Sequence, residues 1–363
     1  MRYFPALTGV RGIAALWVFL FHAFQGVKIP FVANGHRGVD LFFVLSGFII
    51  SHIHASDFTC GFSWWTFRRF MALRISRIYP LHLLTLFSLL FVVLLCNPFT
   101  NVYSPGAFSA FNFVGNLFLV HKWLTPFIPY EMRGPGWSWN GPAWSLSAEW
   151  LMYLLFPAIA VILGRSARTS IVLALGVCGL AGYAALEFAG VALAGFPRVG
   201  AEFFAGCTIY FGLSNRCELW HYWNLTSWLS VLLILLASIV NGMQVFTPAA
   251  CCALIPAIAF GNGFIARFFS SKISLQLGEI SLALYLIHWP ILQIQQRFLP
   301  INWNSSWVAI TSHFLFLLGI VGLAFLIHRH FELPMRDQFR KWLVGRPSNS
   351  EVAKPQDLVV LEN

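Results

Sequence analysis

Long apolar runs recur along almost the whole chain, and this feature restricts its fold more than any other. Most runs are about 16 to 22 residues long, the length that an α-helix needs to cross the hydrocarbon core of a membrane. The pattern predicts an all-α fold, a polytopic membrane helix bundle of about ten transmembrane helices. The predicted spans are residues 10–26, 38–55, 79–96, 143–164, 170–187, 198–213, 225–241, 246–264, 279–297 and 307–328.

The composition excludes a soluble domain of this size, because 58% of the 363 residues are hydrophobic and only 10% are charged. The formal net charge of +10 does not indicate a nucleic-acid partner, because the basic residues stand at the ends of the apolar runs. The first run lacks a clear small-residue cleavage site, so we interpret it as a retained helix. The seven cysteines show no CxxC spacing, and we expect neither a disulfide framework nor a zinc site.

The basic residues predict the orientation of the spans. With the N-terminus inside, every cytoplasmic loop carries basic residues, as the positive-inside rule requires. These residues are Arg68, Arg69, Arg74, Arg77, Arg165, Arg168, Arg216, Arg267, Lys272, Arg329, Arg336, Arg340 and Lys341. The outer loops hold fewer, namely Lys28, Arg37, Lys122 and Arg133. We therefore predict that the N and C termini are both cytoplasmic.

The longest predicted outer loop, residues 97–141, is rich in Pro, Gly, Asn and Trp. A loop of this length more often has a function than serves only as a connection. Within it, residues 109–123 form a short apolar stretch that favours a re-entrant or interfacial piece over a span. We predict one membrane domain at residues 1–341 and a disordered cytoplasmic tail at residues 342–363.

Arg11 and His22 are the ionisable residues of the first run, and eleven positions separate them. Eleven steps of about 100° return to nearly the same helix face, roughly 16 Å further along the axis. An ionisable side chain within a span is costly and usually faces a cavity or a partner. The alternative is that Arg11 reaches to the interface and His22 bonds a carbonyl group in the bundle, and the pair alone does not decide between the two.

Asp40 and Ser46 are the polar residues of the segment GVDLFFVLSGFII, Gly38 to Ile50. They are six positions apart, so they do not share a helix face. Both are candidate substrate-binding residues. The alternative is an interfacial position for Asp40 and a hydroxyl group bonded to its own helix for Ser46, which no GxSxG motif surrounds.

Arg74 and Arg77 stand three positions apart in the segment WWTFRRFMALRISRIYP. Paired guanidinium groups suit diphosphate and phosphomonoester oxygens, which favours a cytoplasmic site for a phosphate-rich cofactor. The segment also fits an amphipathic helix on anionic lipid, and its composition leaves the two interpretations equal.

The segment GPGWSWNGPAWSLSAEWLMY carries Trp137, Trp144 and Glu149 at the predicted outer end of a span. Tryptophans at that depth are ordinarily interfacial residues, but such rings also stack on sugar faces. A carboxylate within a span needs a partner, so Glu149 is a candidate for the chemistry.

Two further polar groups have simpler interpretations. Arg198 and Glu202 are four positions apart, which predicts an ion pair within one helix. His328 and His330 form an H-x-H motif near the end of the last run, but their spacing is unspecific and we predict no metal site.

In order along the chain, these segments resemble the acyltransferase type 3 family of integral membrane O-acyltransferases. The resemblance runs from Tyr3 to about Arg336. It rests on LTGVRGIAALWVFLFH with its R-x10-H spacing, GVDLFFVLSGF, RISRIYP, GPAWSLSAEW, LGEISLALYLIHWP and FELP.

The resemblance implies a multi-pass enzyme of the bacterial inner membrane. Such enzymes move an acyl group, commonly acetyl, from cytoplasmic acyl-CoA to a hydroxyl group of a cell-envelope or exported glycan, for example in lipopolysaccharide or exopolysaccharide. Acyl-CoA is then a co-substrate rather than a permanently bound cofactor. The family's motif residues correspond to Arg11 and His22 and to Arg74 and Arg77, and Glu149 is the next candidate base.

The runner-up hypothesis is a transporter of a glycan or metabolite without acyltransferase activity. It would explain polar groups within spans, but it predicts broken helices in two corresponding halves, and the sequence shows no such symmetry. A structural membrane scaffold is a weaker third hypothesis, because it gives His22 and the arginine pair no role.

Overall fold

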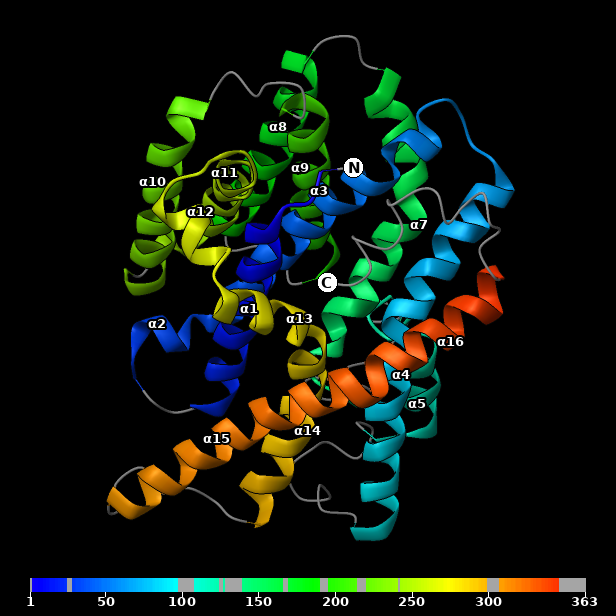
Figure 1. The fold of residues 1–363 in the computed structure, drawn as a ribbon, viewed down its shortest axis with the longest axis vertical. Helices are drawn as coiled ribbons and strands as arrows, with labels where there is room; N and C mark the ends of the chain where they lie inside the picture. Colours follow the sequence, from blue (N-terminus) through cyan, green and yellow to red (C-terminus); the bar gives the residue numbers. More distant parts are fainter. Residues whose placement is uncertain are drawn as a thin grey trace. The chain divides into compact units, whose positions relative to one another are not determined.

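The computed structural model describes residues 2–24, 28–96, 108–123, 127, 139–165, 169–189, 195–213, 220–240, 242–298 and 307–345. Within these ranges the chain forms helices and no β-strand, which confirms the all-α class (Figure 1).

The α-helices are α1 (Pro5–Ala23), α2 (Pro30–Ala33), α3 (Gly38–Phe58), α4 (Trp64–Cys96), α5 (Ala110–Leu117), α7 (Ala143–Arg165), α8 (Thr169–Phe188), α9 (Phe196–Leu213), α10 (Trp220–Ile239), α11 (Thr247–Phe260), α12 (Phe264–Phe269), α13 (Lys272–Glu279), α14 (Ser281–Phe298), α15 (Trp307–Ile327) and α16 (Leu333–Val344). Single turns of other helix types are the 3-10 turns η1 (Gly35–Arg37) and η4 (Met243–Phe246) and the π-helical turn η5 (His328–Glu332).

A helix occupies each of the ten predicted spans. In the described part of the chain, seven helical segments are long and apolar enough to cross a membrane. An eighth results if α13 and α14, which are broken at Ile280, form one span. The chain is therefore a multi-pass helical membrane protein, whereas the number of ten spans and the cytoplasmic termini stay predictions.

Two predicted boundaries differ from the structure. The arginine-rich segment before the third span is not a separate helix, because α4 continues through it from Trp64 to Cys96 with Pro80 inside. A proline removes one backbone hydrogen bond, but the apolar turns on either side continue the helix. The predicted tail begins too early, since α16 extends to Val344, and residues 346–363 lie outside the described residues.

The chain divides into two compact units, which we describe separately. Unit 1 comprises Met1–Ala72, Met152–Ser281 and Val344–Asn363, and unit 2 comprises Leu73–Leu151 and Leu282–Leu343. In unit 1, α9 packs against α3 and α8, α1 against α13, and α10 against α11 (Figure 1). The buried apolar core between these helices includes Val10, Val44, Phe48, Leu254 and Ile258.

Small residues bring the helices of unit 1 close together. A Cβ atom on Gly12 of α1 would overlap the backbone nitrogen of Gly278 of α13, and one on Gly278 would overlap the carbonyl oxygen of Thr8. Between α3 and α9, a Cβ atom on Gly206 would overlap the carbonyl oxygen of Val44. Helices in lipid associate through such close backbone contact, because lipid tails offer no hydrophobic drive for association.

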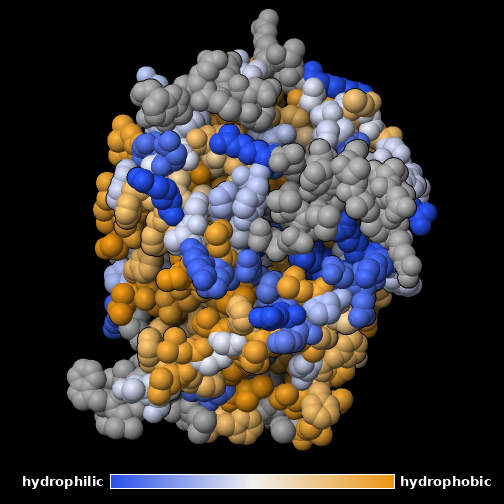
Figure 2. Space-filling model, viewed as in Figure 1, coloured by the Kyte–Doolittle hydropathy of each residue, from blue (hydrophilic) through white to orange (hydrophobic). Residues whose placement is uncertain are grey.

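Unit 2 contains most of α4, α5, the first turns of α7, and α14 to α16. Leu86, Leu89 and Trp139 form a small buried cluster in it. By contrast, Phe91 of α4 and Leu315 of α15 are exposed. Apolar atoms cover much of the visible surface in Figure 2, as expected for helices that face lipid.

We expect Gly12→Ala to lower the thermal stability of the purified protein, because the added methyl group must separate α1 from α13. Overpacking of this kind costs about 1–3 kcal/mol. Gly182→Ala is the matched control, because a Cβ atom there meets nothing within 4 Å. Melting curves in detergent should show a loss for Gly12→Ala and none for Gly182→Ala. Equal melting temperatures would contradict the close packing.

Candidate functional site

His22 lies in the last turn of α1, and its side chain is partly buried. Its ring packs edge-on against Phe21, with 4.9 Å between the ring centroids. Phe21 also packs against His36 of η1, at 5.4 Å. The turn η1 therefore brings a second imidazole to the end of α1 that carries His22.

Arg11 lies on the same helix, as predicted, and holds α1 against the end of α13. Its Nη2 atom donates a hydrogen bond of 2.8 Å to the carbonyl oxygen of Gly278, which also accepts one from the Ser281 hydroxyl group at 2.7 Å. The last carbonyl groups of a helix lack partners within it, and a cation there also meets the negative end of the helix dipole. This contact gives Arg11 a positioning role, whereas cofactor binding by Arg11 stays a prediction.

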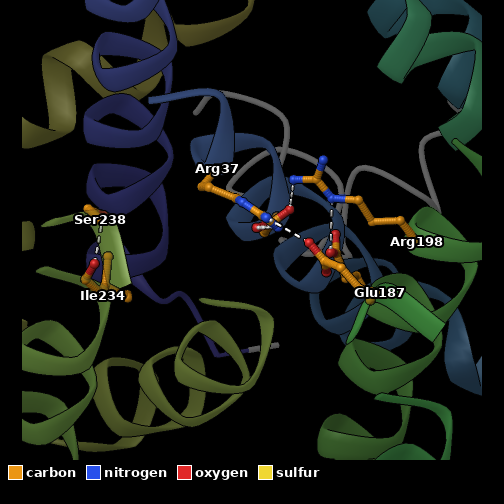
Figure 3. A network of polar contacts seen from close by, with 7 residues as sticks. Arg37, Glu187, Arg198, Ile234 and Ser238 are labelled. Carbon is orange, nitrogen blue, oxygen red and sulfur yellow. Dashed lines mark hydrogen bonds and ion pairs between the residues drawn. The ribbon is translucent and has the colours of Figure 1, made fainter. Parts of the chain in front are cut away.

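Five ionisable side chains form a network at the start of α3 (Figure 3). Arg37 of η1 bonds Glu187 of α8, with 2.9 Å between Nη2 and Oε1, and its Nη1 atom lies 3.7 Å from Oδ2 of Asp40. Arg198 of α9 donates from Nη2 to Oδ1 of Asp40, and its Nε atom lies 3.4 Å from Oε1 of Glu202. The network thus joins η1, α3, α8 and α9.

The energetics of the network depend on its burial. The side chains of Asp40 and Glu202 are 0% exposed, and that of Arg198 is 12% exposed. Removing a charge from water costs several kcal/mol, and an ion pair recovers this only when both partners are in place. Two guanidinium groups face three carboxylates here, so the loss of either guanidinium would leave buried negative charge without compensation.

Asp40 is fully buried between Arg37 and Arg198, and its position at the membrane interface stays a prediction. Both of its oxygens face guanidinium groups, which indicates a structural role beside η1. Ser46 lies further along α3 and is partly exposed. Substrate binding by Asp40 and Ser46 stays a prediction.

The sequence predicted part of the network. The ion pair between Arg198 and Glu202 is confirmed, because both lie on α9 at helical spacing. The roles of Arg37 and Glu187 were missed. The three-residue spacing of Arg37 and Asp40 could have indicated one contact, but Glu187 has no such local partner, and its contact with Arg37 spans 150 positions.

In unit 2, Arg74 and Arg77 lie one turn apart on α4, as predicted. Arg74 is 2% exposed and Arg77 is partly exposed. The charge of Arg77 repels that of Arg336 on α16, so these two guanidinium groups lie near each other. Neighbouring guanidinium groups attract an anion with several oxygens, which fits a phosphate ligand. The lipid-anchoring alternative stays open as well, because Trp64 and Trp65 at the start of α4 are exposed.

The start of α7 is tied to α14 by three hydrogen bonds in unit 2. Asn140 donates from Nδ2 to the Leu286 carbonyl oxygen at 2.8 Å. The hydroxyl groups of Ser145 and Tyr285 lie 2.8 Å apart, and Tyr285 also donates to the Pro142 carbonyl oxygen at 3.1 Å. These bonds bring together the segments GPAWSLSAEW and LGEISLALYLIHWP, a contact that sequence spacing did not predict.

Glu149 lies four residues after Ser145, so both stand on one face of α7. Glu149 is partly exposed, and its role as a second candidate base stays a prediction. Trp144 is also partly exposed, with the Lys122 ammonium group 5.7 Å from its ring centroid. Trp137 lies outside the described residues.

Among the described residues, no group of three or more His, Cys, Asp or Glu side chains could hold a metal ion. His328 of the H-x-H motif instead bonds Glu332 across η5, with 2.9 Å between Nδ1 and Oε2. This contact gives His328 a protein partner rather than an open ligand position.

Replacing Arg198 by Met should destabilise the protein by about 3–5 kcal/mol, because Asp40 and Glu202 would both lose a buried counter-charge. Arg165→Met is the control, since Arg165 ends α7 in an exposed position. Chemical unfolding of the two variants should separate them clearly. Wild-type stability of Arg198→Met would show that the network carries little of the stability of unit 1.

Comparison with known proteins identifies related chains. A putative peptidoglycan O-acetyltransferase, YrhL of Bacillus subtilis, is 25% identical over 93% of this chain and 55% of its own length. Peptidoglycan O-acetyltransferase OatA of Listeria monocytogenes is 22% identical over 92% of this chain and 56% of its own length. Acyltransferase MdmB of Streptomyces mycarofaciens is 29% identical over 81% of this chain and 80% of its own length.

The chain spans little more than half the length of the first two relatives. No solved structure matches it significantly. A family model described as an acyltransferase domain matches residues 4–329, which include α1 with His22, α3 with Asp40, α4 with its arginine pair, and α7. The chain therefore belongs to this acyltransferase family, the type 3 acyltransferases that its sequence resembles.

Proposed function

We propose that this chain transfers an acyl group, acetyl in the first instance, from cytoplasmic acyl-CoA to a hydroxyl group of a cell-envelope glycan. The family match over residues 4–329 carries the proposal, because it covers nearly all of the described helices of both units. The names of the relatives support acetyl as the group and a glycan as the acceptor.

The proposed base is His22. It takes the proton of the acceptor hydroxyl group while the hydroxyl oxygen attacks the carbonyl carbon of the thioester. When the tetrahedral intermediate collapses, the carbon–sulfur bond breaks, the ester remains on the glycan, and the imidazolium returns its proton to the CoA thiolate. A neutral imidazole can accept this proton near neutral pH. In the alternative mechanism, His22 itself attacks the thioester carbonyl carbon and releases CoA, and the acyl-histidine then transfers the acyl group to the hydroxyl group.

The proposed site for the CoA phosphates is the pair Arg74 and Arg77. The two arginines lie one turn apart on α4, so their guanidinium groups can share an anion with several oxygens. Arg11 holds α1, the helix that carries His22, against α13.

The proposed acceptor is a surface glycan such as peptidoglycan, which is the substrate in the names of two relatives. This favours peptidoglycan over the lipopolysaccharide and exopolysaccharide acceptors that also fit the family. Trp137 and Trp144 would stack on the sugar faces, as aromatic rings do in sugar sites.

We expect His22→Gln to abolish acyl transfer by the purified protein, because an amide forms hydrogen bonds but accepts no proton near neutral pH. The loss should reach at least the roughly 10²–10⁴-fold that general acid–base catalysis supplies. Glu149→Gln, measured in parallel, tests the other candidate base. Near-normal turnover by His22→Gln together with a large loss in Glu149→Gln would transfer the catalytic role to Glu149.

Acyl-CoA should protect the wild-type protein against heat, because a ligand that binds only the folded state stabilises it by about 2.7 kcal/mol at a hundred times its dissociation constant. In Arg74→Ala/Arg77→Ala this protection should fall strongly, and in His22→Gln it should persist. Lysine replacements should restore it poorly, because an ammonium group lacks the guanidinium fork. If the wild-type protein gained no protection, the transporter hypothesis would become the better one.

A further inference from the structure

An open groove in unit 2 lies between α4 and the segment formed by η5 and α16. Its volume is about 540 Å³, and eight of its nine lining residues are apolar, with Ser88 as the polar one. The groove takes no part in the chemistry proposed above, because neither a candidate base nor a candidate acceptor residue lines it.

The α4 side of the groove is one continuous helix face. Pro80, Leu84, Phe87 and Phe91 line it at intervals of four, three and four residues, which is the spacing of a single helical stripe. The eleven steps from Pro80 to Phe91 correspond to roughly 16 Å along the axis. This is about half of the ~30 Å hydrocarbon core, or the depth of one leaflet.

The other side of the groove comes from Phe331, Met335 and Phe339, spaced four residues apart through η5 and α16. Arg336 and Arg340 directly follow two of these apolar residues, so their charges stand at the edge of the same stripe. Trp342, one turn further on, is 80% exposed, as an aromatic residue at a membrane interface would be. In Figure 2 hydrophilic atoms gather over α16, and apolar atoms cover the region of unit 2 below it.

The charges at this edge are predominantly positive. Arg336 interacts electrostatically with Arg77 and Arg340, which repel it, and with Glu332 and Asp337, which attract it. Glu332 is also engaged by His328, at 2.9 Å. Three guanidinium groups and two carboxylates therefore stand beside an apolar groove, and an anion there would lower the repulsion between the guanidinium groups.

We propose that this groove binds one anionic phospholipid. An acyl chain lies along the apolar face of α4, and the phosphate group rests against Arg336 and Arg340. Basic pockets between membrane helices are suited to anionic lipid head groups, and the groove has the length of one leaflet. Arg77 keeps the CoA role proposed above, so the lipid would lie next to the donor site without being part of it.

The amphiphilic character of the groove favours a lipid over the other possible occupants. A second copy of the chain would need a complementary acidic and apolar surface, and a long acyl chain of the donor would need its thioester near a candidate base. A phospholipid needs neither a protein surface nor a nearby base, because its phosphate group matches the arginines and its acyl chain matches the apolar lining of the groove.

The test uses the full-length protein purified in mild detergent and measures lipids retained per protein by native mass spectrometry. Wild-type protein offered equal amounts of phosphatidylglycerol and phosphatidylcholine should retain the anionic lipid preferentially. In Arg336→Gln/Arg340→Gln its affinity should fall roughly 30-fold, from about 1 kcal/mol for each basic residue near an anionic lipid. Ser88→Trp, which fills the groove without changing charge, should also release it.

Arg329→Gln is the matched control, since it removes an exposed positive charge just before the groove residues of the same segment and should retain the lipid. Equal retention of both lipids by the wild-type protein would overturn the proposal without the need for any variant. Displacement of the bound lipid by acyl-CoA would assign the groove to the donor. Self-association that disappears in Ser88→Trp would assign it to a second copy of the chain. Either result would contradict a phospholipid site.

Discussion

The cost of burying a charge without a partner governs the structure of unit 1. Asp40 and Glu202 are completely buried, and each is held by the guanidinium group of Arg198. Arg37 joins the same network from η1 and extends it to Glu187 on α8. Because none of these charges is stable in an apolar interior alone, α3, α8, α9 and η1 must come together for any of them to be satisfied.

The network has a consequence for the proposed catalytic residue. His36 directly precedes Arg37, and its ring packs against Phe21, the neighbour of His22. The opposite half of α1 is held against α13 by the close contact of Gly12 with Gly278 and by the Arg11 hydrogen bond. Helix α1 is thus fixed at two places, so the imidazole of His22 projects from a rigid element, as a positioned base requires.

Local patterns in the sequence predicted the helices and the contacts within a helix, because these depend on the spacing of nearby residues. Apolar runs located the helices, the four-residue spacing of Arg198 and Glu202 predicted their ion pair, and the eleven-residue spacing placed Arg11 and His22 on one helix. These patterns could not predict contacts between segments that lie far apart in the sequence. The bond between Ser145 and Tyr285 and the contact of Arg37 with Glu187 depend on how helices pack, which no periodicity encodes. The apolar run placed the start of the third span at residue 79, whereas α4 begins at Trp64 and continues through Pro80.

We propose that this membrane protein is an enzyme that acylates a glycan from acyl-CoA. The most direct measurement supplies the purified protein with acetyl-CoA labelled in its acetyl group and with peptidoglycan fragments, and then analyses the glycan by mass. We expect labelled acetyl esters on glycan hydroxyl groups and release of one free CoA thiol for each ester. Folded protein that binds CoA but leaves peptidoglycan and other envelope glycans unlabelled, with no thiol released, would contradict it.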